Sequence, residues 1–417
     1  MSNLEFEVLQ HRSDALEVAT ESLLRTYDLL DASLESGGAS HQMYQSIEQS
    51  IAFNSKVFNL PAISVVSNED IRNRSKTQIS MEGILSTVGS AIKAIYEFMK
   101  SMVARFFDWV SAAFNRFRRL RSGFENLNER LNKIIDSGKV PIDAELKFKL
   151  SPDDSGWFDF REVSNIARNW SEWVSCITRE LESEKNGALP VAKAWVEQLM
   201  SVAIDVNKKN VKGQISVPVN MSKFNLSVAQ PYESATPVLH DLKVGVRKVV
   251  TWPGGRGILV RICDESPDVI EKLRREDPVK YLQALSIFRV QFEHTRRYTN
   301  GMVYRESCRS LQMHFSRVLK SIDKVIGVEN AVNHHMKELQ RAINRAEPFL
   351  AFTERAGLES GQGKQSLSAF AALRALVYSS TSYQIEVLGY TATMLRVYKL
   401  LAENAINGFE NMKKEKA

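Results

Sequence analysis

A long stretch with helical periodicity, residues 84–121, constrains the fold more than any other part of the sequence. Its apolar side chains recur at alternating steps of three and four residues, and aromatic residues widen this stripe to about half of the helix surface. Charged side chains occupy the other half. The pattern predicts one long amphipathic helix. The helical pattern continues to a stop signal at Ser137-Gly138, with Gly123 as a candidate interruption.

Two environments suit such a helix. A buried helix packs its apolar stripe into a protein core, whereas an interfacial helix places the stripe in the headgroup layer of a membrane. Residues 83–121 contain seven basic and two acidic side chains, so anionic lipid or DNA would attract them. The side chains expected to contact a membrane or a partner are Phe98, Phe106, Phe107, Trp109, Phe114 and Phe117. Those expected to contact phosphate or lipid headgroups are Lys93, Lys100, Arg105, Arg116, Arg118, Arg119 and Arg121.

The charge of the chain changes sign just before this helix. Residues 1–82 carry 12 acidic and 6 basic side chains, whereas residues 83–417 carry 37 acidic and 49 basic ones. The boundary coincides with a Ser-x-Glu tripeptide, Ser80-Met81-Glu82, which is followed by Gly83. Helical periodicity upstream of a Ser- and Asn-rich linker at 60–80 predicts that the acidic part is a helical leader.

The remaining sequence predicts an α-dominant α+β protein with a small antiparallel sheet and a bundle of long helices. With 44% apolar residues, a chain of 417 residues can bury substantial cores. Strands are expected at 144–150, 214–219, 224–228, 244–251 and 257–263, where apolar and polar residues alternate or β-branched residues cluster. Helices are expected at 1–35, 41–57, 161–185, 189–209, 267–298, 303–326, 328–355 and 366–408. The predicted segments are the leader (1–82), an amphipathic helical segment (83–138), a mixed α/β segment (139–265) and a helical bundle (266–417).

No motif predicts catalytic chemistry. G-x-S-x-G and H-E-x-x-H are absent, and the glycines of Gly254–Gly257 favour a hairpin turn over a phosphate-binding loop. The adjacent His334 and His335 point about 100° apart on a helix, so a shared metal ion is disfavoured. We therefore expect no catalytic residue, no metal ligand and no cofactor. The three cysteines are far apart and outside any C-x-x-C spacing: Cys176, Cys263 and Cys308.

The order of an acidic helical leader, a Ser-x-Glu tripeptide and a helix rich in Phe, Trp and Lys resembles a known family. It is similar to the precursors of internal virion proteins, the inner-body or prohead-core proteins, of giant tailed bacteriophages. In that family a prohead protease cuts after a small-x-Glu motif while the head matures. The resemblance implies a cut after Glu82, which makes the leader a propeptide. Three more tripeptides fit the motif, ending at Glu35, Glu48 and Glu69, but the charge reversal favours Glu82.

The resemblance implies a non-enzymatic structural protein, assembled in the bacterial host cytoplasm, packaged inside the phage head and ejected with the genome. Its implied partners are other virion proteins, the prohead protease, and packaged DNA or an anionic membrane. Loss of the leader raises the net charge from +6 to +12, which strengthens attraction to DNA. Two alternatives stay open: a membrane-active, interfacial or pore-forming protein that uses residues 84–121, and an enzyme or toxin domain within 139–417.

Overall fold

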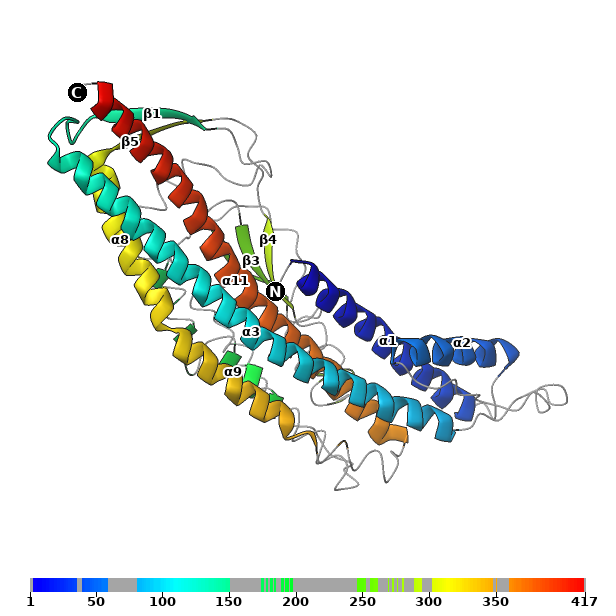
Figure 1. Cartoon of the computed structure of the whole chain (residues 1–417). Coiled ribbons are helices and arrows are strands. Elements are labelled where there is room, and N and C mark those ends of the chain that lie inside the picture. Colours follow the sequence, from blue (N-terminus) through cyan, green and yellow to red (C-terminus); the bar gives the residue numbers. More distant parts are fainter. Residues whose placement is uncertain are drawn as a thin grey trace.

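Two helices of 56 residues each, α3 (Met81–Asp136) and α11 (Ser360–Glu415), form the long axis of the structure. Each is about 84 Å long at 1.5 Å per residue, and the two lie side by side in the same direction in this computed structural model (Figure 1). The residues that the structure describes are 3–35, 40–58, 81–150, 246–252, 256–261, 289–294, 302–347, 350 and 360–415, with scattered positions between 174 and 197 and between 269 and 280.

Helix α3 forms where the helical periodicity of the sequence predicts it. The helix begins at Met81, close to the predicted start, and passes through Gly123 without interruption. It ends at the predicted stop signal, where Gly138 has φ +64° and donates its backbone N–H to Ile135 O at 3.0 Å. Glycine suits this left-handed position because it has no Cβ to clash there.

Helices α8 (Cys308–Gly327) and α9 (Glu329–Asn344) run along α3 in the opposite direction (Figure 1). Helix α8 begins with a capping box in which the Ser307 and Ser310 side chains bond reciprocally to backbone N–H groups. One face of each helix is buried, as expected for helices that cover a core from one side. The periodic part of the prediction for 328–355 is confirmed over α9.

The acidic leader is helical, as predicted. Helix α1 (Asn3–Glu35) and helix α2 (His41–Val57) lie next to each other at one end of the molecule (Figure 1). A polar cluster joins them: Ser50 Oγ lies 2.7 Å from Ser22 Oγ and 2.6 Å from Thr26 Oγ1, and Asn54 donates to Ser50 at 3.2 Å. The two helices therefore have contacts of their own, besides those with the rest of the chain.

The strands form two antiparallel sheets. Strand β1 (Glu145–Leu150) pairs with β5 (Met302–Ser307), so that Glu145 faces Ser307 and Leu150 faces Met302. The other sheet has the order β2–β3–β4, made of Val246–Trp252, Arg256–Arg261 and Arg289–His294. The predicted strands at 144–150, 244–251 and 257–263 are confirmed. Those at 214–219 and 224–228 and the linker at 60–80 lie outside the described residues.

Two helix predictions are wrong in part, because strands occupy 289–294 and the start of 303–326. In Arg289–His294, the apolar Val290 and Phe292 alternate with polar residues, which is a period of two and typical of a strand. Strand β5 finds its partner far upstream in the chain, at β1. Such long-range pairing overrides local helical preference and leaves only a weak local signal.

A continuous hydrophobic core is shared by α1, α3, α8, α9 and α11. At its centre, Phe124 of α3 lies 5.9 Å from Phe315 of α8 and 6.0 Å from Tyr398 of α11, measured between ring centroids. The α-dominant prediction is confirmed. The four predicted segments stay a prediction. The hydrophobic core contains residues from the leader, from 83–138 and from 266–417.

Candidate functional site

The leader is joined to the rest of the protein by a buried charged contact. Arg374 of α11 is 1% exposed, and its guanidinium donates to Ser13 O at 2.7 Å and to Ser13 Oγ at 2.6 Å. It also pairs with Glu17 Oε2 at 3.0 Å. All three acceptors belong to α1. Buried charges are rare unless they are paired, so this contact positions α1 on α11.

The predicted cleavage residues lie where α3 begins. Met81 is its first residue, and Glu82 and Gly83 belong to its first turn, whereas Ser80 lies outside the described residues. The first four N–H groups of a helix have no partner within the helix, so a first turn unwinds more easily than the interior. Fraying of this first turn would leave the buried residues of α3 from Thr87 onward in place.

The aromatic stripe of α3 fills the core in this structure. Five of its six predicted contact residues are at most 5% exposed, and Phe107 is half-buried against the core. The stripe finds its apolar partner in α11, α8 and α9, which is why it is covered. Contact with a membrane would require α3 to leave these helices, and it stays a prediction. The five buried residues are Phe98, Phe106, Trp109, Phe114 and Phe117.

Two of the predicted phosphate-contacting residues are paired with acids instead. Arg118 forms an ion pair with Glu329, the first residue of α9. Arg121 bonds to Asp323 of α8 at 2.5 Å and also pairs with Glu125. These pairs tie α3 to α8 and α9, so both cations are partly neutralised on the surface.

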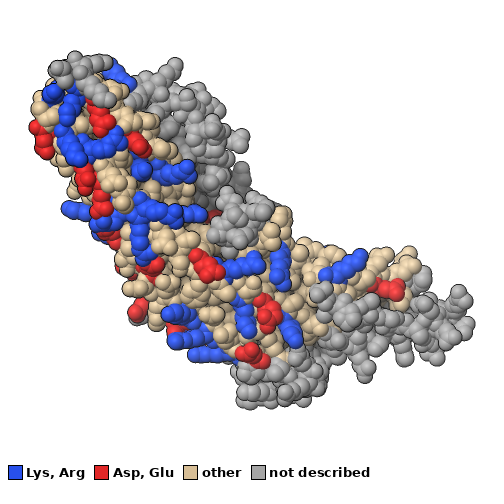
Figure 2. Space-filling view, in the orientation of Figure 1, with Lys and Arg blue, Asp and Glu red and all other residues tan. Residues whose placement is uncertain are grey.

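The other predicted cations are exposed or partly exposed at the surface. The Lys100 ammonium lies 5.2 Å from the centre of the Tyr96 ring, and Lys93 is exposed. Figure 2 shows that basic side chains mix with acidic ones over this face of the molecule. The described part of the chain provides no ion pair for three exposed arginines of α3: Arg105, Arg116 and Arg119.

Two further cations, which sequence reasoning missed, come from α11. A Cβ placed on Gly123 would lie 2.5 Å from Lys399 Cε, so the Lys399 side chain crosses α3 one turn beyond Arg119. Arg396 is exposed one turn before Lys399. We call Arg116, Arg119, Arg396 and Lys399 the basic seam. The sequence carries no local signal for it, because the seam exists only once α3 and α11 pack together.

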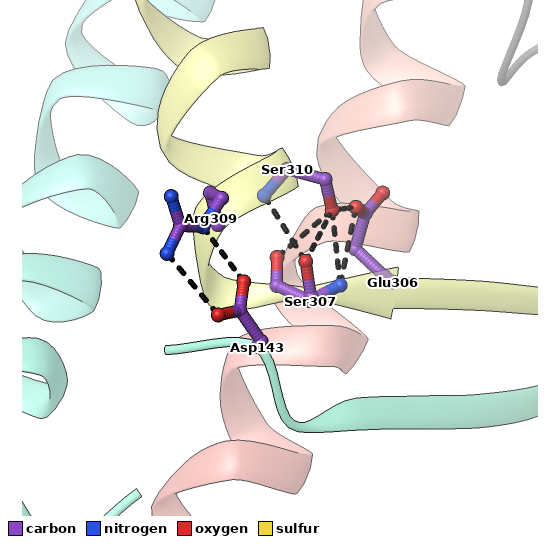
Figure 3. Close-up of polar contacts among 5 residues, drawn as sticks. All are labelled: Asp143, Glu306, Ser307, Arg309 and Ser310. Carbon is purple, nitrogen blue, oxygen red and sulfur yellow. Dashed lines mark hydrogen bonds and ion pairs between the residues drawn. The ribbon is translucent and has the colours of Figure 1, made fainter. Parts of the chain in front are cut away.

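A polar junction fixes the start of α8 to the β1–β5 sheet (Figure 3). The buried Glu306 carboxylate accepts from Ser310 Oγ and from the Ser307 backbone N–H at 3.3 Å. The Arg309 guanidinium bonds to both oxygens of Asp143, at 2.7 and 3.1 Å. Together these contacts hold the end of β5 and the entry to β1 against the first turn of α8.

The junction contains residue types that also occur in hydrolases, but in another arrangement. The Ser310 hydroxyl donates to a carboxylate and not to an imidazole, as a nucleophile with a histidine base would. His314 Nδ1 lies 3.8 Å from the other Glu306 oxygen. Burial raises the pKa of the nearby Cys308 thiol to about 11, so this thiol stays protonated and weakly nucleophilic at neutral pH. The Ser307 and Ser310 side chains of this arrangement cap the start of α8.

Among the described helices, none combines the length and apolarity needed to cross a lipid bilayer. In the same part of the chain, no three or more His, Cys, Asp and Glu side chains gather in a way that would hold a metal ion. Cys176 and Cys263 lie outside the described residues.

Residues 2–210 match the phiKZ-like phage internal head proteins, and this match covers both the leader and the long helix α3. The chain belongs to the phiKZ-like phage internal head proteins. As an internal head protein it is located inside the phage head, where it is a structural component among other virion components. No curated protein and no solved structure matches the chain. The match over residues 2–210 confirms the resemblance to internal head proteins of giant phages that the sequence showed.

Proposed function

We propose that this internal head protein is a non-enzymatic precursor that a prohead protease cuts after Glu82. The observation that supports the proposal is the position of Glu82, between the leader helices and the rest of α3. The leader helices α1 and α2 pack on each other, and a single segment joins them to the first turn of α3, where Glu82 lies. A cut there divides the chain into an acidic part and a basic part without breaking a helix interior, and α1 keeps its contacts with α11.

Processing predicts a defined N-terminus in the phage particle. Protein extracted from virions is expected to begin at Gly83, by N-terminal sequencing and intact mass. In phage that carry Glu82→Gln, the protein is expected to keep residues 1–82, because the protease loses the carboxylate at the cut. The control is Glu48→Gln in α2, where the helix interior hides the bond from a protease, and processing should be normal. A wild-type N-terminus at Met1 would refute the proposal.

We further propose that the partner of the basic body is packaged DNA and not a membrane. The aromatic stripe that a membrane would require is buried, whereas the basic seam is on the surface. The seam combines exposed cations of α3 and α11 near the contact between Gly123 and Lys399, and such cations can neutralise the phosphates of DNA. The nearest acid along α11 is Glu403, one turn beyond Lys399, and it interacts with Arg130.

Neutralising the basic seam is expected to weaken DNA binding and to reduce its salt dependence. The slope of log affinity against log salt should fall by about 0.9 for each phosphate of duplex DNA that the variant no longer neutralises. Fluorescence anisotropy with a labelled duplex at several salt concentrations measures it. The tested variant is R116Q/R119Q/R396Q/K399Q. The charge-matched control changes four exposed cations of α8 and α9: R317Q/K320Q/K337Q/R341Q.

Comparison of the two quadruple variants shows whether DNA contacts the basic seam or senses only the net charge of the protein. If both quadruple variants change the slope equally, DNA senses only the net charge, and the seam is not the contact surface. If neither the wild type nor the variants bind duplex DNA at low salt, the DNA proposal fails. Flotation of the full chain with anionic liposomes then tests the membrane alternative.

A further inference from the structure

One segment of α11 is buried on every side. Each of the nineteen residues from Ser366 to Gln384 is buried, whereas α3 and α8 bury only one face each. A helix buried all round must be covered by several neighbours. Helix α3 covers α11 along its length, and α1 and β4 also contact it. Helix α1 therefore covers one side of the buried segment of α11 and is packed against the rest of the protein.

The contact between α1 and α11 has an anchor and a rim. Arg374 is the anchor, because it bonds to the backbone carbonyl and hydroxyl of Ser13 and to the carboxylate of Glu17. At the rim, Lys364 bonds to Asp28 of α1 at 2.5 Å. The anchor and the rim are both basic on α11 and acidic on α1, so the contact is complementary in charge as well as in shape.

Apolar and small side chains complete the contact. On α1, the apolar side chains at helical spacing are buried in the common core: Leu9, Leu16, Leu23, Tyr27 and Leu30. On α11, the buried segment is rich in Ala and Ser, which let a neighbouring helix approach closely. Arg12 of α1 also lies over the Phe98 ring of α3, 5.9 Å from its centre. The ligand that fits this surface is thus an amphipathic helix with an acid and a small polar residue one turn apart.

We infer that the α11 surface around Arg374 is a binding site for an acidic amphipathic helix, and that α1 stays bound there as a separate chain after the cut. The inference rests on the proposed processing, because only a cut makes α1 a separate ligand. Cutting alone then leaves the acidic charge of α1 in place over the body. Release of the leader requires a further event that breaks the Glu17–Arg374 contact.

The experiment uses an engineered cut and does not depend on the natural one. A recognition site for a sequence-specific protease is inserted in the full chain between α2 and α3, and the nicked protein is analysed by gel filtration and native mass spectrometry. The fragment that contains α1 is expected to co-elute with the body at micromolar concentration. With Glu17→Gln, the dissociation constant of this fragment is expected to rise roughly 30-fold or more, since the buried Arg374 guanidinium loses its acidic partner.

Matched variants separate the anchor from a general loss of charge. Glu21→Gln makes the same charge change on an exposed position one turn further along α1, and it should leave the dissociation constant unchanged. Uncut Glu17→Gln should still elute as the wild type does, because the linker keeps α1 at a millimolar effective concentration. A wild-type fragment that separates on nicking would overturn the inference, as would equal release from E17Q and E21Q. A Met1 terminus in virions refutes only the processing.

Discussion

Replacement of Phe124 by alanine is expected to lower the free energy of unfolding by about 3–5 kcal/mol, the range for large-to-small changes at buried aromatic residues. Phe124 is completely buried and meets Phe315 and Tyr398, so its ring connects α3, α8 and α11 at one point. The cavity left by alanine would lie between three helices. Each of them is held by many other contacts, so little collapse is expected to fill it.

Chemical denaturation followed by circular dichroism measures this destabilisation. The control is Phe53→Ala, the same substitution at a side chain of α2 that is 42% exposed, where the destabilisation should be under about 1 kcal/mol. Equal destabilisation in the two variants would show that Phe124 is not a central packing residue.

Replacement of Arg374 by alanine is expected to cost about 3–5 kcal/mol, because it removes a large, fully buried side chain together with its ion pair to the partly exposed Glu17. The change leaves Glu17 and the Ser13 carbonyl without the guanidinium that satisfies them, and it opens a space in the most buried part of α11. Arg396→Ala, an exposed position on the same helix, should stay within about 0.5 kcal/mol of the wild type.

A double variant identifies the cause of that destabilisation. Arg374→Met with Glu17→Leu replaces the charged pair by apolar side chains of similar size, and such replacements are often neutral or stabilising. Thermal and chemical denaturation should show that the double variant recovers most of the stability that Arg374→Ala removes. If it is as unstable as the single variant, the shape of the arginine matters more than its charge.

The long helices were predictable because their periodicity extends over many turns. Helices α1, α2, α3 and α11 each follow a repeat that a single strand or loop could not maintain. Strands β4 and β5 were missed because each is six residues long and is stabilised by a strand elsewhere in the chain. The end of α3 was predictable because Gly138 marks it. Gly123 also predicted an interruption, but the helix continues through it.

The site was less predictable than the fold, for a physical reason. A stripe of Phe and Trp has the same composition whether it faces lipid or another helix, and only the position of α11 decides between them. Arg374 was missed as a functional residue, yet the sequence carried a signal for it. It is the only charged residue in the nineteen from Ser366 to Gln384, and a lone charge in such a run needs a partner.

The contact between α1 and α11 also has a consequence for folding kinetics. Ser13 and Arg374 are 361 residues apart in sequence, so the leader helix is synthesised long before the helix that completes its surroundings. At roughly 5–20 residues per second, α1 waits on the order of 20–70 s on the ribosome before Arg374 is made. The polar contacts between α1 and α2 give the early chain a local partner during this interval. The central core therefore forms late, and the first helix of the chain is also among the last to reach its final position.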